Sequence, residues 1–229
     1  MGEQELKFHV PRQASHSLRH WLDRAFRPHR RHPVSTICSI YFDTASRRSF
    51  REKESSDYRK TKYRIRWYAD AGGIPLDVPA FLEIKEKHGS ARRKYRTVLP
   101  MAPKELLAAP LADPMWHGFF QRFQTGDAPV PRLELHPFLE LRYCRHRYTH
   151  PLFPDAFCLD SEIHCVRTHP AHLPPARSTP LDHDVFEQKG KAQDPLPVLR
   201  PLPRFDVQRS SVSKYFLAIL QLQPDCLPA

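Results

Sequence analysis

The sequence predicts a β-rich α+β fold: a single antiparallel β-barrel of about eight strands, which forms a tunnel with a charged bore and is flanked by amphipathic helices. Three observations predict it. Strand-like segments outnumber helical ones. Seven of them place charged residues on one face and apolar residues on the other. Helical periodicity is confined to four amphipathic segments.

Eight segments have the aromatic and β-branched composition of strands: 4–10, 35–42, 58–68, 80–87, 92–99, 133–148 (one strand or two), 157–165 and 184–189. Helices are predicted at 15–26, 103–109, 114–123 and 211–222, with Ser210 or Ser211 as the N-cap of the last. The proline-rich segments 169–180 and 194–203 are expected to be surface loops. Since neither resembles an interdomain linker, we expect one domain over residues 1–229, with its core at 3–220.

The alternation is clearest in YRKTKYRIRWY, residues 58–68. Because successive side chains of a strand point to opposite faces, one face collects four cations and the other collects aromatic and aliphatic residues. The cations are Lys60, Lys62, Arg64 and Arg66. The same alternation recurs in the strands that carry Lys7, Glu83, Lys94, Asp160 and Glu187.

Two interpretations of these charged faces compete. For any single strand, a half-solvated face that points to water is the simpler one. Against it, the faces mix cations with carboxylates and contain almost no Ser, Thr or Asn. We therefore expect the faces to converge on an aqueous tunnel, where carboxylates neutralise some cations and a polyanion neutralises the rest. Carboxylates left over would suit a hard divalent metal ion.

The composition agrees with an anionic partner. The chain has 229 residues with 36 Lys and Arg against 25 Asp and Glu, a formal charge of +11, which favours nucleic acid, polyphosphate, nucleotide or an acidic membrane. No segment approaches the ~20 apolar residues of a membrane span, and the first residues lack the pattern of a signal peptide. Five cysteines form no C-x-x-C pair. We therefore expect a cytoplasmic protein with reduced thiols.

Five motifs stand in order along the chain: EQELK (3–7), YRIRWY (63–68), FLEIKEK (81–87), FEQKG (186–190) and SSVSKY (210–215). Together they resemble the CYTH/triphosphate tunnel metalloenzyme superfamily, and most closely its VTC branch, the polyphosphate polymerase domain. The resemblance covers residues 3–220 and implies a tunnel that binds ATP or inorganic polyphosphate or triphosphate together with Mn²⁺ or Mg²⁺. In this branch the γ-phosphate of ATP is transferred to a polyphosphate chain, whereas other branches hydrolyse or cyclise triphosphates.

The resemblance and the charged faces together assign the candidate site. Arg64, Arg66, Lys85 and Lys214 are the predicted catalytic residues. The predicted phosphate ligands are Lys7, Lys62, Lys87, Lys94, Arg142, Arg145, Lys189 and Ser213. Glu187 is the predicted metal ligand, with help from Glu5, Glu83 or Asp160. If water is the acceptor, Glu3 or Glu5 is the expected general base. Asp43 is expected to cap a turn.

The chain departs from the branch at one position. Four residues before Asp160, where the polymerases usually have arginine, stands Ala156; Arg142 or Arg147 could replace that contact. The alternatives are a triphosphatase or nucleoside triphosphatase of the same superfamily, and a polyphosphate binder without turnover, which Ala156 keeps open. A nucleic-acid binder is the competing class, but carboxylates on the cationic faces would repel a phosphodiester backbone.

Overall fold

The computed structural model describes residues 4–89, 91–124, 129 and 131–226. The chain divides into two compact units, and each unit consists of three separate stretches of the sequence. Unit 1 comprises Met1–Thr36, Tyr143–Ile163 and Pro180–Val212, and unit 2 comprises Ile37–Arg142, His164–Thr179 and Ser213–Ala229. Each unit is thus built from segments far apart in the sequence. The single domain over residues 1–229 stays a prediction.

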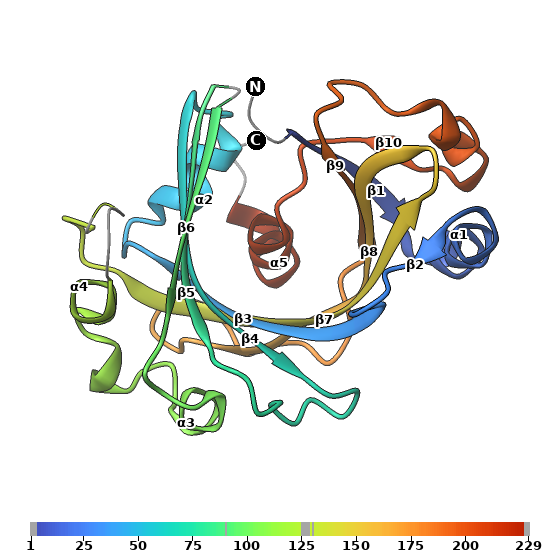
Figure 1. Ribbon diagram of the computed structural model, residues 1–229. Helices are drawn as coiled ribbons and strands as arrows, with labels where there is room; N and C mark the ends of the chain where they lie inside the picture. The colour runs from blue at the N-terminus through green and yellow to red at the C-terminus, as the bar shows by residue number, and fades with distance from the viewer. Residues whose placement is uncertain (1–3, 90, 125–128, 130, 227–229) are drawn as a thin grey trace. The chain divides into compact units, whose positions relative to one another are not determined.

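The strands are β1 (Gln4–Pro11), β2 (Arg27–Pro28), β3 (Val34–Asp43), β4 (Arg59–Ala69), β5 (Phe81–His88), β6 (Ala91–Val98), β7 (His136–His150), β8 (Phe153–Thr168), β9 (His183–Gly190) and β10 (Gln208–Arg209). Over the described residues they form one ten-stranded antiparallel sheet in the order β10-β1-β9-β8-β7-β3-β4-β5-β6, with β2 paired to β7 (Figure 1). Residues 133–148, expected as one strand or two, contribute the single strand β7.

The predicted closed barrel is wrong, because the sheet is open in its strand order. The two ends of that order are β6 and β10. The last strand has only two residues, because the segment before it forms 3-10 turns at Pro197–Leu199 and Leu202–Phe205 and its backbone N–H groups donate within those turns. The predicted number of about eight strands is also too low, since the short strands β2 and β10 carry no alternation that a sequence could reveal.

The α-helices are α1 (Arg12–Ala25), α2 (Arg48–Glu54), α3 (Pro103–Ala108), α4 (Phe119–Phe123) and α5 (Lys214–Leu222), and the 3-10 helices are η1 (Pro114–Trp116), η2 (Pro197–Leu199), η3 (Leu202–Phe205) and η4 (Pro224–Cys226). The helix expected at 114–123 is interrupted. Gly118, which lies between η1 and α4, adopts a left-handed conformation with φ of 60° that a continuous helix does not allow. The N-cap of α5 is Ser213, not Ser210 or Ser211, because the Ser213 side chain accepts from the backbone of Phe216.

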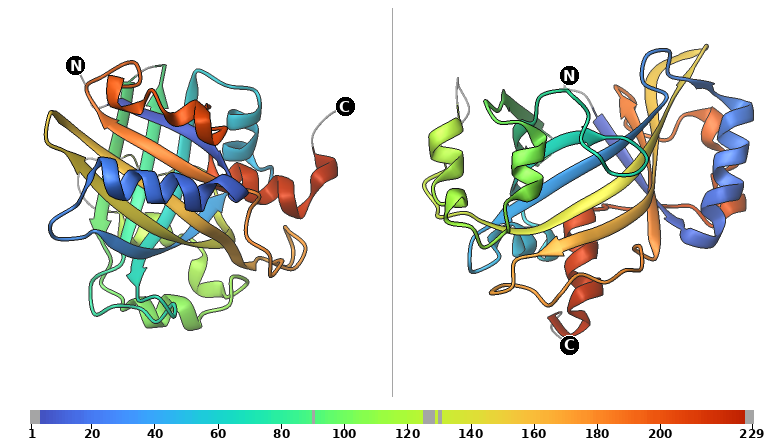
Figure 2. Two further views of the ribbon diagram at one scale, coloured as in Figure 1. Left: turned by 90° about the vertical axis from the view of Figure 1, so that its right-hand side faces the viewer. Right: turned by 90° about the horizontal axis from the view of Figure 1, so that it is seen from below.

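Helix α1 covers the apolar face of the unit 1 strands. Its buried residues Leu18 and Leu22 join a core with Phe8 of β1, Phe157 of β8 and Phe186 of β9. In Figure 2 the helix crosses the strands of this unit. The opposite face of β1 and β9 is thereby left to charged residues, as the alternation predicts.

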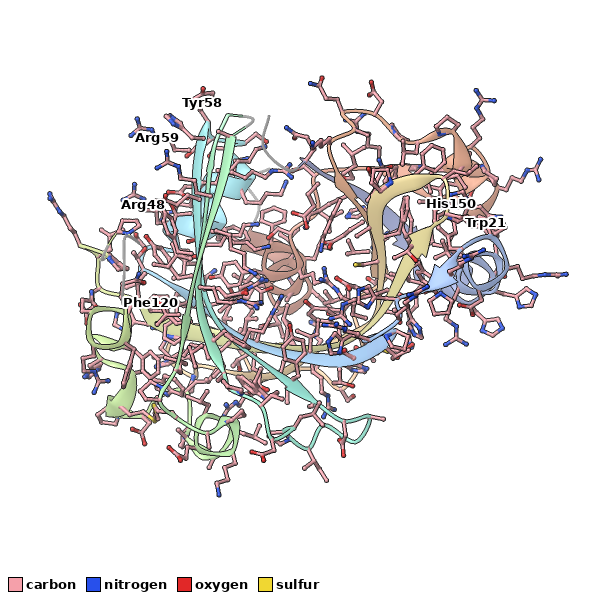
Figure 3. All side chains as sticks on the ribbon, in the orientation of Figure 1. Trp21, Arg48, Tyr58, Arg59, Phe120 and His150 are labelled. Atoms are coloured by element: carbon pink, nitrogen blue, oxygen red, sulfur yellow. The ribbon has the colours of Figure 1, made fainter. Side chains whose placement is uncertain are left out.

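In unit 2 the apolar and charged residues of β4 also separate. Ile65 and Trp67 are fully buried in a core that α3, η1 and α4 cover. Phe120 of α4 belongs to this core and meets the ring of Tyr63 edge to face at 5.4 Å (Figure 3). Arg64 and Arg66 therefore lie on the other face of the strand. In the part of the chain that the structure describes, no helix is long and apolar enough to span a bilayer.

Candidate functional site

Three strands of unit 2 arrange predicted phosphate ligands in rows across the sheet. β5 pairs with β4 on one side and with β6 on the other, so that residues directly opposite one another form rungs. Successive rungs on one face are about 7 Å apart. The three rungs, called the cation ladder below, are Arg64–Glu83–Arg96, Lys62–Lys85–Lys94 and Lys60–Lys87–Arg92. Like charges directly opposite each other destabilise a sheet, so this face favours an anionic ligand.

Glu83 is the single carboxylate of the cation ladder, and it is fully buried. Its Oε2 lies 2.5 Å from Arg64 Nη2 and 3.9 Å from Arg66 Nη1. Its Oε1 lies 2.7 Å from Lys94 Nζ and 2.6 Å from Arg96 Nη2. Burial alone would raise the pKa of Glu83, but Arg64, Arg66 and Lys94 hold it far below its usual range. One negative charge therefore faces four cations.

Strand β3 supports the two arginines of β4 from the same face. Arg66 donates through Nε to Ser39 Oγ at 3.2 Å, and Arg64 donates through Nη1 to the hydroxyl of Tyr41 at 3.4 Å. All four side chains are buried. Although burial opposes it, the cations Arg64, Arg66 and Lys214 lower the pKa of the Tyr41 phenol below its ordinary value. The cationic field of the ladder thus reaches β3.

The first turn of α5 lies against the cation ladder. Lys62 Nζ donates to Ser213 Oγ at 2.9 Å, and Ser213 is the N-cap that precedes Lys214. Lys214 is buried, and its charge contributes to the lowered pKa of Tyr41. The free N–H groups and the positive dipole end of a helix add to the attraction for anions. The structure therefore brings three predicted site residues, Lys62, Ser213 and Lys214, to one place.

The outer rungs also carry an excess of positive charge. Burial, Arg92 and Lys60 lower the pKa of Lys87, and burial, Lys60 and Lys87 lower that of Lys53 in α2. The pKa of Lys94 is lowered by burial, although Glu83 opposes the shift. A lowered lysine pKa means that the charged form is disfavoured, so an incoming anion would relieve the repulsion.

Unit 1 holds a second charged cluster, in which cations and carboxylates alternate. β1 and β9 place Lys7 directly opposite Glu187, and Glu5 opposite Lys189. Lys7 Nζ lies 2.8 Å from Glu187 and 3.5 Å from Glu5. Lys189 Nζ lies 2.9 Å from Glu187 and 3.7 Å from Glu5. Two carboxylates therefore share the same two ammonium groups.

Arg145 of β7 extends the unit 1 cluster to Asp160 of β8. Its Nη2 donates to Asp160 Oδ2 at 2.6 Å and to Glu187 Oε2 at 3.1 Å. Burial and Arg145 would lower the pKa of Lys189, but Glu187 and other neighbours raise it above its ordinary value. Lys189 is thus firmly protonated. The cluster contains three cations and three carboxylates, against one carboxylate in the cation ladder.

A family model, the VTC domain, matches residues 2–223. The chain belongs to the VTC domain family. This confirms the family inferred from the sequence. No curated protein matches the chain. A solved structure of a proposed adenylate cyclase from Bacillus halodurans superposes with a TM-score of 0.55 at 16% identity, covering 93% of this chain and 96% of the other. A second, from Vibrio parahaemolyticus, has a TM-score of 0.44 at 10% identity and covers 94% and 96%. The first neighbour shows that the fold matches the CYTH-like tunnel fold in outline.

A divalent metal of the kind the VTC family implies needs oxygen donors, and Glu5 and Glu187 fit that need. Both carboxylates lie within 4 Å of Lys7 Nζ and Lys189 Nζ, so their oxygens are held close together. Oxygen ligands are those that Mg²⁺ and Mn²⁺ prefer. Within the described residues, no three His, Cys, Asp or Glu side chains gather closely enough to hold a metal by themselves. The remaining ligands would come from the phosphate groups or water.

Other predicted residues lie apart from these clusters. Arg142 lies against Gly73 and near the core residue Cys38, on the apolar side of the unit 2 sheet. Arg147 donates to Ser35 Oγ at 2.8 Å in unit 1. Ala156 of β8 lies directly opposite Lys189, so the arginine usual in the VTC family would add a cation beside that lysine. Glu3 lies outside the described residues.

Sequence reasoning missed the residues that hold the predicted ligands in place. Ser39 and Tyr41 alternate along β3 and are buried on the face of Arg64 and Arg66. Asp43, expected only as a turn cap, continues this alternation and is also buried. The alternation was visible in SIYFD (39–43), but both Tyr41 and Phe42 are aromatic, so the apolar pattern alone did not show which of the two belongs to the charged face. Arg96 was expected on the same charged face as Lys94, but no binding or catalytic role was predicted for it.

Proposed function

We propose that the protein is a metal-dependent phosphotransferase that transfers the γ-phosphate of ATP to a polyphosphate chain. Membership in the VTC domain family supports an enzyme of the tunnel superfamily. The observation that carries the proposal is the charge of the cation ladder, where buried Glu83 faces four cations and Lys85 lies between Lys62 and Lys94. Triphosphate and polyphosphate supply dense negative charge, which Arg binds through its planar fork and Lys as a point charge.

Catalysis by this arrangement consists of positioning and charge stabilisation. Arg64 and Arg66 would bind oxygens of the transferred phosphoryl group with their planar guanidinium groups, while Lys85 would neutralise charge as it develops. Lys214, in the first turn of α5, would bind a further phosphate oxygen. Because Ser39, Tyr41 and Glu83 already orient Arg64 and Arg66, these two side chains need little reorganisation when the substrate binds.

The unit 1 cluster, considered by itself, offers side chains of the kinds that bind phosphate and a divalent metal. Lys7, Arg145 and Lys189 are the phosphate ligands, and Glu187 with Glu5 would hold Mn²⁺ or Mg²⁺. When bound, such an ion supplies additional charge neutralisation to the phosphate oxygens. Asp160, which accepts from Arg145 in a short ion pair, orients that arginine.

The test is incubation of the purified protein with ATP and Mn²⁺, followed by electrophoresis that resolves polyphosphate chains. We expect long chains from the wild type. Arg66→Ala should reduce chain formation by about 10²-fold, the loss typical of removing one donor to a developing anion. The variant should remain folded, because Glu83 keeps Arg64, Lys94 and Arg96.

The matched control is Arg93→Ala. Arg93 is an exposed cation of β6 that lies opposite Glu86, with the other parity from Lys94 and Arg96, and we expect its removal to leave activity unchanged. Equal losses in both variants would contradict the role of Arg66. Free phosphate without chains would assign the protein to the triphosphatases, and binding without turnover would favour the alternative that Ala156 keeps open, since it leaves no cation opposite Lys189.

A further inference from the structure

The carboxylate of Asp43 ties three parts of unit 2 together. Asp43 is fully buried at the end of β3. Its Oδ1 accepts from the backbone of Thr44 and of Ser49, each at 2.8 Å. Its Oδ2 accepts from the backbone of Phe50 at 3.1 Å and from the Tyr215 hydroxyl at 2.9 Å. Asp43 thus caps the turn that leads into α2, as expected from the sequence. Its hydrogen bond with Tyr215 is a different kind of contact, because it joins the end of β3 to the distant helix α5.

Tyr215 is the second residue of α5 and follows Lys214 directly. Its buried ring stacks on Tyr41 with centroids 5.5 Å apart and an interplanar angle of 18°. Tyr41 in turn accepts from Arg64. The hydroxyl of Tyr215 therefore fixes the rotation of α5 about its axis at one end, while its ring contacts the side chain next to the cation ladder.

We infer that Asp43 and Tyr215 form a positioning pair, which holds the first turn of α5 so that Lys214 and Ser213 face a phosphate group. The inference rests on the proposed function, because it assigns the pair a purpose only if that turn binds phosphate. The pair itself touches no substrate. It acts through Lys214, whose buried ammonium group would lose its orientation if the helix end rotated.

The chain offers a matched control for this pair. In unit 1 the Tyr148 hydroxyl donates to Asp23 at 2.8 Å, and both tyrosine rings are only 2% exposed. Tyr215→Phe and Tyr148→Phe thus remove the same chemical bond from equally buried rings. Both should lower the melting temperature by a similar few degrees.

The experiment is isothermal titration calorimetry with sodium tripolyphosphate on the full chain. We expect Tyr215→Phe to weaken binding by about 5- to 10-fold, as loss of one hydrogen bond to a charged group allows, and Tyr148→Phe to leave binding unchanged. In a Lys214→Met background, Tyr215→Phe should weaken binding no further, because residues that act through one another are not additive. A purely structural role would give the same loss in both backgrounds.

Three results would overturn the inference. If the wild type binds tripolyphosphate and Tyr215→Phe binds equally well, the positioning role fails while the proposed function stands. Equal losses from Tyr215→Phe and Tyr148→Phe would also refute it, since the effect would then be one of general stability. If the wild type binds no tripolyphosphate, the proposed function falls, and the inference falls with it.

Discussion

Replacing Glu83 by glutamine removes one negative charge and keeps the size of the side chain. In the wild type this buried carboxylate contacts four cations. Glutamine can accept hydrogen bonds from them but cannot neutralise them. The cations would then repel one another inside unit 2, so Glu83→Gln should destabilise the folded state while leaving the unfolded state almost unchanged.

The size of the effect follows from the exposure of the partners. The side chains of Arg64 and Arg66 are 10% and 7% exposed, whereas those of Lys94 and Arg96 are 41% and 36% exposed. Removing one partner of a buried pair costs about 3–5 kcal/mol, and each of the two half-exposed pairs adds about 0–1 kcal/mol. We therefore expect a loss of about 3–7 kcal/mol, a large part of the ~5–15 kcal/mol that stabilises a typical protein.

Urea denaturation measures this loss, and Glu86→Gln is the control. Glu86 lies on the opposite face of β5 from Glu83, paired with Thr61 and Arg93, and its replacement should change the free energy of unfolding by less than about 0.5 kcal/mol.

The stabilisation by Glu83 should also depend on pH. Because the pKa of Glu83 is held low in the folded state, the stabilisation that this carboxylate provides is present near pH 7 and fades as the pH falls below the unfolded value of about 4.3. Tripolyphosphate should restore stability to Glu83→Gln more than to the wild type. A loss under about 1 kcal/mol would refute the assignment of Glu83 as the shared counter-ion.

Two further predictions concern stability. Burial raises the pKa of Asp184 in unit 1 to about 6, so between pH 4 and 6 the folded state binds more protons than the unfolded state. Stability should fall by about 3 kcal/mol as the pH rises through this window, and Asp184→Asn should remove that slope in urea denaturation; an unchanged slope would contradict it. Arg167 donates to Glu140 at 2.6 Å and to three carbonyl groups at the end of α3. Arg167→Met should cost about 3–5 kcal/mol by urea denaturation, and the double variant with Glu140→Gln should be more stable than the single one, because no buried charge remains.

The alternation of β4 and β5 could be read from the sequence because it is a local property. In a strand, the period of two decides which residues share a face. Ile65 and Trp67 entered the core, and Arg64 and Arg66 lie together on the opposite face, as predicted. The pattern also placed Glu83 on the face of the arginines.

The partners within a charged face could not be predicted, because they depend on register between strands. A slip of two residues would leave every face unchanged, yet it would place Glu83 opposite Lys62 instead of Arg64. The closure of the sheet is likewise set by pairing between distant segments, and no local signal marks an edge strand such as β6. The role of Tyr215 was hidden for the same reason, since Asp43 is distant in sequence.

The most direct test of the cation ladder is a crystal structure of the protein with tripolyphosphate and Mn²⁺. We predict phosphate oxygens within hydrogen-bonding distance of Arg64, Arg66 and Lys85. Phosphate groups bound only to exposed surface residues, with these three side chains making no contact to them, would contradict the account.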